Sequence, residues 1–500
     1  MLTRFILIVV FLGVFTSALF ANHPNLLIIT VDDMNADSIG AFGAELESTS
    51  PNVDRLAAEG LSFDLAHVQV GNCYPSRNVM WSGRYSHNNG AEGFYEVKPI
   101  NYPTLCDLMQ KHGYWVGIRG KVSHSSPYQP FHWDADLTFK RDGTSEHMKD
   151  ARSYFRSVKR GIKLAENEGK PFCINVNISD PHKPFWKPGD PHPVSKVFTA
   201  DEVPVPGFLP DDPAIREELA LYYTSVRRAD DCVGEILEAL SESGKAEETF
   251  VMFLSDHGMP LPFAKTQLYH HSTRTPLIVR WPGVAEPGTR DDEHMVSAVD
   301  FLPTLLDVVG AKKPGGFDGS SFAPLFHGEK LPGRDSVFKV YNENSGAQRH
   351  PIRGVETPEY LYLFNPWSDR VNKFKTATQG TVTYKRLIAL AEEDAAIAAR
   401  LDLFDYRVLE ELYDVRNDPD CLVNLIDDPS HEAALSDLRA RAEKFMRESG
   451  DHALEPFLNR EDPEAVAAYI TRVTEEAQAR RAERRKNKRE TGGKDKKKSA

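Results

Sequence analysis

The 500-residue sequence has few cysteines, one long apolar run and no internal repeat. Its five cysteines are too widely spaced to identify a disulfide framework or a zinc motif. No segment beyond the N-terminal apolar run looks transmembrane. These absences argue against a small disulfide scaffold, a zinc module and a protein with several membrane-spanning helices. Apart from Cys73, we expect the cysteines to be buried thiols, although their spacing leaves any pairing undefined: Cys106, Cys173, Cys232 and Cys421.

The composition is that of a large globular protein. Hydrophobic residues make up 41% of the chain and aromatic residues 10%, which is ample for a large core. The length suggests roughly two to four conventional domains, or one large α/β unit with a smaller partner.

The N-terminus has the pattern of a secretory signal. Arg4 precedes the apolar run 5–15, and small residues follow up to Ala21. We therefore predict that residues 1–21 are a signal peptide and that the protein is exported, either to a periplasm or by secretion, with no stable membrane partner after cleavage. An uncleaved membrane anchor is the alternative, because the apolar stretch is long.

Charge is unevenly distributed. The formal net charge is −13, but residues 480–500 contain 11 basic and 3 acidic residues, which gives this tail +8 and the remainder −21. The tail lacks apolar periodicity, so we predict a disordered basic tail at 480–500. In an exported protein we interpret it as a solvated segment that can touch anionic polymers or envelope surfaces, and we expect no nucleic-acid partner.

Strands and helices alternate through the first 330 residues. Apolar runs predict buried strands at 25–31, 115–118, 171–176 and 249–254. Helical patterns are found at about 50–60, 105–112 and 214–240. The alternation predicts an α/β domain at 22–330, built on a large, mostly parallel sheet covered by helices on both faces.

Acidic residues follow two of these strands. Asp32 and Asp33 come directly after the first strand, and Asp256 and His257 come after the strand at 249–254. Ligands bind such sheets beyond the carboxyl ends of their strands, so these four side chains are expected to converge.

The character of the chain changes after about residue 330. Short strands are predicted at 336–341, 360–364, 381–388 and 411–415, and helices at 431–449 and 462–481. We expect a smaller C-terminal α+β subdomain at 331–470.

The most informative segment surrounds Cys73. Residues 72–77 read Asn-Cys-Tyr-Pro-Ser-Arg, and Ser-Gly-Arg follows at 82–84. Pro75 suits the first turn of a helix and Gly83 suits its end. Cys73 is therefore expected just before a helix N-terminus, where free N–H groups and the helix dipole favour an anion. Taken alone, Cys-x-Pro-x-Arg fits a buried or disulfide-bonded cysteine equally well.

The Cys-x-Pro-Ser-Arg block followed by Ser-Gly-Arg resembles the site at which type I sulfatases convert a cysteine into Cα-formylglycine (3-oxoalanine). The resemblance extends over about residues 25–428 and looks closest to heparan N-sulfatase (sulfamidase)-like and iduronate-2-sulfatase-like members. It implies an alkaline-phosphatase-like α/β fold with a small C-terminal antiparallel sheet. It also implies that Cys73 becomes formylglycine, whose hydrated aldehyde has one hydroxyl to attack sulfur and a second to expel the sulfate.

The resemblance further implies a metal site. Asp32 and Asp33 look like the first half of the family's calcium site, Asp256 and His257 look like the second, and modified Cys73 would complete it. Carboxylates suit a hard divalent cation, so we expect one Ca2+ per chain, with magnesium or manganese as alternatives. Taken alone, either pair fits turn chemistry or helix capping.

Five more residues receive roles from the resemblance. Lys121 and Lys265 would bind sulfate oxygens, and Arg77 would hold the formylglycine and the metal ligands. His124 would hydrogen-bond the formylglycine diol, although one extra residue precedes it relative to the family's Gly-Lys-x-His block, as in iduronate-2-sulfatase-like members. His182 would be the general acid, because a histidine titrates near neutral pH.

We therefore expect an exported, calcium-dependent sulfatase that hydrolyses sulfate esters or sulfamates of sulfated sugars. N-sulfoglucosamine of heparan-type glycans ranks first as substrate, and a formylglycine-generating enzyme would be the maturation partner. A phosphonate or phosphodiester hydrolase on the same scaffold is one alternative. A non-catalytic, calcium-dependent sulfated-glycan-binding protein, which needs unmodified Cys73, is another.

Overall fold

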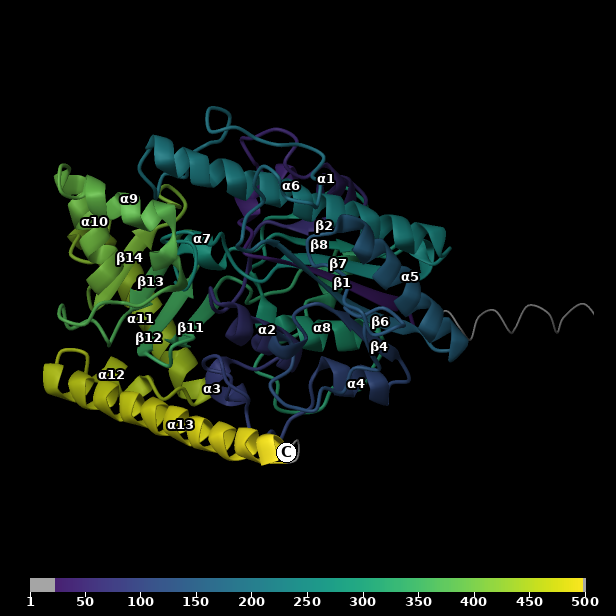
Figure 1. Cartoon of the computed structure of the whole chain (residues 1–500). Helices are drawn as coiled ribbons and strands as arrows, with labels where there is room; N and C mark the ends of the chain where they lie inside the picture. The colour runs from purple at the N-terminus through teal and green to yellow at the C-terminus, as the bar shows by residue number, and fades with distance from the viewer. Residues whose placement is uncertain (1–22, 498–500) are drawn as a thin grey trace, which may run out of the picture.

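The structure is a computed structural model that describes residues 23–497, with side chains described through residue 486. The predicted signal peptide lies outside the described residues. Figure 1 shows two units, a large α/β domain and a smaller C-terminal subdomain that carries the long helix α13 along its edge. No helix in the described part of the chain is both long and apolar enough to cross a membrane.

The described residues form one eight-stranded sheet in the α/β domain, with the strand order β5-β4-β6-β1-β7-β8-β2-β9. Its strands are β1 (Asn25–Asp32), β2 (Leu61–Phe63), β4 (Trp115–Arg119), β5 (Ala135–Asp136), β6 (Phe172–Pro181), β7 (Thr249–Ser255), β8 (Leu277–Arg280) and β9 (Thr289–Asp291). β1 pairs in parallel with β6 and β7, whereas β8 runs antiparallel to β7 and β2. The prediction of a mostly parallel sheet is confirmed. A separate short pair joins β3 (Ala66–His67) to β10 (Val296–Ser297).

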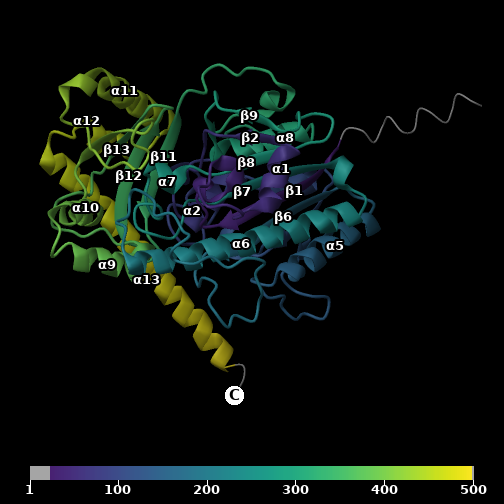
Figure 2. The same cartoon turned by 90° about the horizontal axis from the view of Figure 1, so that it is seen from above.

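Helices cover both faces of this sheet. They are α1 (Pro51–Ala58), α2 (Cys73–Ser82), α3 (Ser86–Asn89), α4 (Leu105–Lys111), α5 (Ala151–Asn167), α6 (Pro213–Glu242), α7 (His270–Thr273) and α8 (Phe301–Val308). Figure 2 shows α5 and α6 lying side by side along one face. Leu27, Ile29 and Val31 of β1 belong to the core on that face, while Leu26 and Ile28 belong to the core on the other. Burial on both faces explains why β1 is a continuous apolar run.

The C-terminal subdomain is built on an antiparallel sheet in the order β11-β12-β13-β14. Its elements are β11 (Val337–Glu343), β12 (Arg349–Glu356), β13 (Tyr360–Phe364), β14 (Glu410–Asp414), α9 (Val382–Leu390), α10 (Ala395–Tyr406), α11 (Glu432–Ser449), α12 (Leu454–Leu458) and α13 (Pro463–Lys497). Three of these strands and helices α11 and α13 were predicted, whereas β12 and α10 were not.

The predicted strand at 381–388 is wrong, because this segment is helix α9. The Thr381 side chain caps the helix by accepting from the Tyr384 N–H. The Thr383 N–H and hydroxyl both donate to Glu218 on α6, at 2.7 Å. Tertiary contacts therefore override the strand preference of a run rich in β-branched residues.

The predicted disorder at 480–500 is also wrong for residues 480–497, which continue α13. The Arg480 guanidinium lies 4.0 Å from the centre of the Tyr95 ring and pairs with Glu343. Arg484 donates to the Phe94 carbonyl oxygen at 3.1 Å. A tail that looked solvated thus has partners on the folded body.

All five cysteines lie in the described part of the chain, are buried and form no disulfide there. The expectation of buried thiols is therefore confirmed for the four cysteines other than Cys73.

Candidate active site

The carboxyl ends of β1 and β7 bring the predicted acidic residues together. Asp32 is the last residue of β1, and Asp256 follows the neighbouring parallel strand β7. The Asp33 N–H donates to Asp256 Oδ1 at 3.1 Å. Asp33 has a left-handed φ of 72°, which turns the chain sharply after the strand. The convergence expected of these strand ends is present.

Cys73 is the first residue of α2 and lies in the same place. Its side chain is buried, and Sγ lies 3.3 Å from Nε2 of His257. One turn into the helix, the Ser76 hydroxyl donates to the Asp256 carbonyl oxygen at 2.7 Å. Gly83 ends the helix with a left-handed φ of 64°, as its position predicted. The N-terminus of α2 therefore points at the acidic strand ends.

Four of the five predicted metal-binding residues form one buried group, which we call the nucleophile cluster: Asp32, Cys73, Asp256 and His257. Each offers a ligand atom within 4.8 Å of the others. His257 Nδ1 donates to the Gly258 carbonyl at 3.0 Å, which orients the ring with Nε2 toward Cys73. Asp33, the fifth, lies alongside, with Oδ1 3.2 Å from His257 Nε2. Buried carboxylates beside an imidazole oriented by a backbone carbonyl fit a divalent cation.

Three cations surround the carboxylates. Arg77 is fully buried, its Nε donates to Asp256 Oδ2 at 3.0 Å, and its Nη2 forms an ion pair with the same oxygen at 2.9 Å. Lys265 contacts both oxygens of Asp33 at 2.7 and 2.6 Å, and Lys121 pairs with Asp32. The structure therefore places all three predicted cations at the cluster.

Burial and these cations set the protonation of the cluster. Burial alone would raise the pKa of Asp32, but the attraction of Lys121 holds it well below its usual value. Burial and the nearby Asp32 carboxylate raise the pKa of Asp256. Burial raises the pKa of the Cys73 thiol far above neutral pH. An unmodified Cys73 therefore stays protonated, which makes it a poor thiolate nucleophile.

Two histidines complete the predicted set. His124 lies on the short helix η3 (Val122–His124), with its ring edge-on to Tyr74 and Phe94 at 5.8 Å. Burial and the neighbouring Lys121 lower the pKa of His124 to about 4, so this side chain is neutral at pH 7. His182 follows β6 and is 36% exposed, with Nε2 4.0 Å from Asp33 Oδ2. It is the member of the set that faces solvent.

Sequence reasoning missed the residues that hold His182 in place. Asp180 is buried and accepts from Lys149 at 2.5 Å and from Arg228 at 2.7 Å. Lys149 also donates to the His182 carbonyl oxygen at 2.8 Å, and His182 Nδ1 donates to the Lys183 carbonyl at 2.7 Å. Asp180 lies two residues before His182 in the sequence. The sequence around Lys149 and Arg228 gives no sign that these residues contact Asp180.

Asn177 of β6 is a second omission. Its side-chain oxygen accepts from Arg77 Nη1, and its amide group donates to the Gly120 carbonyl at 3.1 Å. It therefore joins the helix that carries Cys73 to the loop that carries Lys121. An asparagine inside an apolar strand was the available signal.

A second buried group combines two histidines with a carboxylate. We call it the interdomain cluster: His67, His270, Glu356 and Lys339. Glu356 Oε1 lies 2.7 Å from His270 Nδ1 and 3.4 Å from His67 Nε2, and Lys339 pairs with the other oxygen. His67 and His270 come from β3 and α7 of the α/β domain, whereas the ion pair comes from β11 and β12.

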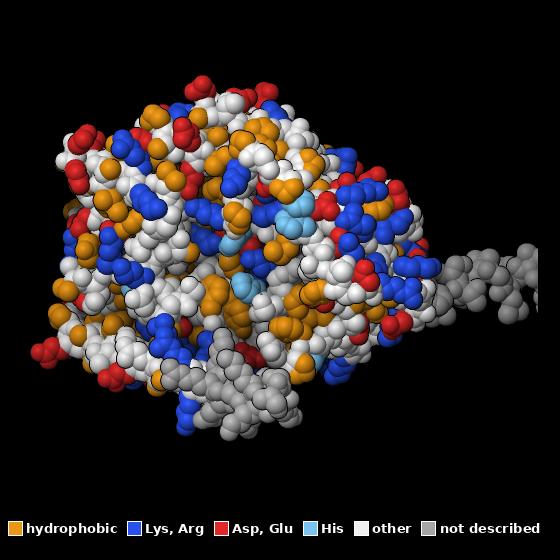
Figure 3. Space-filling model, viewed as in Figure 1, with side chains coloured by type: hydrophobic (Ala, Val, Ile, Leu, Met, Phe, Trp, Pro, Cys, Tyr) orange, Lys and Arg blue, Asp and Glu red, His pale blue; other side chains and the backbone are white. Residues whose placement is uncertain are grey.

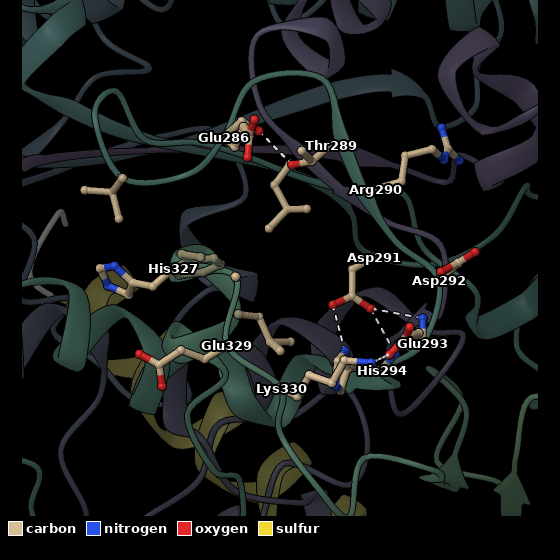
Figure 4. A pocket seen from close by; sticks show the side chains of 15 residues that line it. Glu286, Thr289, Arg290, Asp291, Asp292, Glu293, His294, His327, Glu329 and Lys330 are labelled. Atoms are coloured by element: carbon tan, nitrogen blue, oxygen red, sulfur yellow. Dashed lines mark hydrogen bonds and ion pairs between the residues drawn. The ribbon is translucent and has the colours of Figure 1, made fainter.

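The molecular surface distinguishes two regions. Figure 3 shows Lys, Arg and His side chains gathered near the centre of one face, between the C-terminal subdomain and the α/β domain. The pocket in Figure 4 lies elsewhere, beside β9 and the short helix η6 (Ala323–His327). It is lined by Arg290, Asp291 and His294 among others and contains none of the predicted site residues.

The large mixed sheet with a small antiparallel sheet beside it is the alkaline-phosphatase-like architecture. A structure solved in complex with its substrate D-glucosamine-2-N,6-O-disulfate superposes with a TM-score of 0.63 at 19% identity, covering 86% of this chain and 99% of that one. The sulfatase family model matches residues 24–311, more than half of the chain, so the chain belongs to the sulfatase family. It is therefore an enzyme that hydrolyses sulfuric esters.

The relatives are similar over most of their length. The chain is 27% identical to human N-sulphoglucosamine sulphohydrolase over 487 residues, which covers 86% of this chain and 91% of that protein. It is 26% identical to an ulvan-active sulfatase of Formosa agariphila over 438 residues, covering 87% and 82%. A second family model, N-sulphoglucosamine sulphohydrolase C-terminal, matches residues 256–373.

Proposed function

We propose that this sulfatase acts on sulfated sugars, with N-sulfoglucosamine of heparan-type glycans as its first substrate, and that residue 73 works as formylglycine. The observation that carries the proposal is the position of Cys73, at a helix N-terminus inside an acidic cluster with Lys121 and Lys265 nearby. The C-terminal family match and the human relative support the N-sulfated substrate.

Formylglycine would supply a geminal diol, of which one hydroxyl attacks sulfur and the other expels the sulfate. Lys121 and Lys265 would hold the anionic sulfate oxygens in a site that largely excludes water. His182 would give a proton to the departing oxygen or nitrogen, since its Nε2 is not engaged by the backbone contact made at Nδ1. His124, neutral at pH 7, would hydrogen-bond the diol.

Asp32, Asp33, Asp256 and His257 would hold one Ca2+ together with residue 73. Once the two lysines turn toward sulfate, the three carboxylates need another positive charge, and a hard cation suits their oxygens. Bound there, Ca2+ would supply positive charge toward the oxygens of the nucleophile and of the sulfate. Export through the signal at 1–21 and maturation by a formylglycine-generating enzyme belong to the same proposal.

The test has two parts, each with its own outcome. Mass spectrometry of the peptide that contains residue 73 should show formylglycine in active protein produced with a formylglycine-generating enzyme. Active protein with an unmodified thiol throughout would contradict the nucleophile.

The second part compares N-sulfoglucosamine with 2-O- and 6-O-sulfated sugars. Preference for an O-sulfated sugar would overturn the substrate ranking and leave the nucleophile intact. Rates on an aryl sulfate and an aryl phosphodiester measure any activity of the phosphodiesterase type, which is expected to be the lower of the two.

A further inference from the structure

The packed face of helix α13 changes from apolar to basic along the length of the helix. Val466, Tyr469, Val473 and Ala477 are buried at helical spacing, and Tyr469 and Val473 belong to the apolar core of the C-terminal subdomain. The same stripe continues with Arg480 and then Arg484 in place of apolar residues. The helix therefore leaves the apolar core at Ala477 but does not end there.

The arginines that continue the stripe contact a loop at the rim of the active site. Arg480 stacks on Tyr95 and pairs with Glu343, and Arg484 donates to the Phe94 carbonyl oxygen at 3.1 Å. The Phe94 ring lies 5.9 Å from that of Tyr74, the neighbour of Cys73, and 5.8 Å from that of His124. Two residues thus separate the basic helix from the nucleophile cluster.

This rim is firmly held. In the same loop, Glu92 pairs with Arg349 of β12 at 2.5 Å and lies 2.8 Å from His452 Nε2. Val97 donates its N–H to the Pro127 carbonyl at 2.7 Å. The loop therefore gives the helix a fixed position relative to the site.

Beyond these contacts the helix is cationic and exposed. Arg481, Arg484, Arg485 and Lys486 are all exposed, and Glu483 is the acidic residue among them. The sequence of the following helical residues, 487–497, adds five basic and two acidic residues. From residue 480 to 497 an α-helix extends for about 25 Å. We call residues 480–497 the cationic arm.

An ordinary solvent-exposed helix end would account for the exposure of these arginines. It would not account for their position beside the rim of the active site. The chain outside residues 480–500 carries a net charge of −21, so it repels a polyanion. The cationic arm places the opposite charge beside the proposed sulfate-binding site. A sulfated polymer that has one sugar in the site needs favourable contacts for the sugars beyond it.

We propose that the cationic arm binds the stretch of a sulfated polysaccharide next to the sugar in the active site. This inference rests on the proposed function for its ligand class. The arm would raise the affinity for polymer and contribute nothing to a monosaccharide, because the small substrate does not reach it.

The test compares two triple variants of the full chain that remove the same charge. One is Arg481→Gln, Arg484→Gln and Arg485→Gln, in the arm. The matched control is Arg441→Gln, Arg447→Gln and Arg472→Gln, also in the C-terminal subdomain. Heparan sulfate binding at low salt is measured by calorimetry, with turnover of N-sulfoglucosamine and the Tm measured alongside.

The arm variant is expected to bind heparan sulfate about tenfold more weakly and with a shallower salt dependence, while the control binds as the unchanged chain does. Turnover of N-sulfoglucosamine should stay the same in both. Deleting residues 487–500 should weaken polymer binding in the same direction. Equal weakening in both triple variants, or no weakening in the arm variant, would overturn the inference. Binding is measured without turnover. An error in the proposed substrate would therefore appear in the turnover assay and not in the binding assay.

Discussion

The nucleophile cluster and the interdomain cluster contain the same kinds of side chain but differ in access. In both, histidine nitrogens and carboxylate oxygens are buried within hydrogen-bonding or ligand distance of one another. The nucleophile cluster opens toward His182, which is 36% exposed, and Lys121, which is 17% exposed. In the interdomain cluster, Glu356, Lys339 and His67 are sealed from solvent, and the His270 side chain is 13% exposed.

The difference indicates that buried charged residues can either bind a ligand or stabilise a contact between two domains. Lys121 and Lys265 are held by carboxylates but can reassign their charge to an anion that enters. Lys339 has no such choice, because Glu356 is its buried counter-ion and both side chains are shielded from solvent. We infer that the interdomain cluster joins β12 to the α/β domain, whereas the nucleophile cluster performs chemistry.

The largest effect should come from residue 73. Cys73→Ala removes the attacking group, and loss of a nucleophile costs up to about 10⁶-fold in kcat. The folded state should persist with a modest fall in Tm, because alanine keeps the Cβ of residue 73 but removes one of the proposed Ca2+ ligands. Initial rates on an aryl sulfate and a thermal melt measure the two quantities. A variant that keeps substantial turnover would remove Cys73 from the chemistry.

Removal of the metal should also abolish turnover and should lower the Tm. Arg77, Lys121 and Lys265 offset only part of the repulsion among Asp32, Asp33 and Asp256, so binding of the proposed Ca2+ would stabilise the folded state further. Chelation followed by calcium addition tests this, with metal content measured at each step. Undiminished activity in demonstrably metal-free protein would contradict the assignment. His67→Gln should respond to chelation as the unchanged chain does, because its cluster holds no metal in our interpretation.

The rate loss caused by removing the general acid should depend on the leaving group. A sugar alkoxide or amine needs a proton, whereas an activated phenolate departs without one. His182→Ala should therefore lose about 10²–10⁴-fold on a sugar substrate and much less on an activated aryl sulfate. Lys121→Ala, the control, should impair both, since it holds the common sulfate. Equal losses in the His182 variant would assign that residue to sulfate binding or structure.

Substitutions in the interdomain cluster should lower stability and leave activity intact, which is the opposite of the effect expected for Cys73. Glu356→Gln leaves the buried charge of Lys339 without a counter-ion, which typically costs about 3–5 kcal/mol of stability. The double variant with Lys339→Met should recover much of this loss. Activity per folded molecule should be retained in both, as measured by denaturant unfolding and by rates below the transition. Lost activity in fully folded protein would show that this cluster serves the site as well.

The smallest effect is a pH dependence. Burial holds the pKa of His67 well below its usual value, although Glu356 opposes this, and burial also lowers the pKa of His270. Between the lowered value and about 6.5, the unfolded chain binds protons that the folded chain does not. Stability therefore falls as the pH drops below about 6.5, by up to about 1.4 kcal/mol per pH unit for each such group. His67→Gln should make the fall shallower, and an unchanged slope would contradict this origin.

Sequence reasoning reached the site because strand ends are predictable. A continuous apolar run gives β1, the next residues must leave the sheet, and parallel neighbours bring Asp32 and Asp256 together. It could not reach Lys149, whose contacts depend on how distant segments pack, and it missed Asn177, for which an asparagine within the apolar strand β6 was the available signal. It was wrong where an interaction with a distant segment decides local structure, as at Thr383 with Glu218 and at Arg480 with Tyr95.

The four buried thiols other than residue 73 give this protein built-in reporters of its own opening. Cys173 lies on β6, between β4 and β1 of the large sheet, and Cys421 lies in the C-terminal subdomain, each fully shielded. Burial also raises the pKa of both thiols, so neither reacts until its surroundings separate. Alkylation followed by peptide mapping would therefore time the loosening of the two units separately, with no added probe.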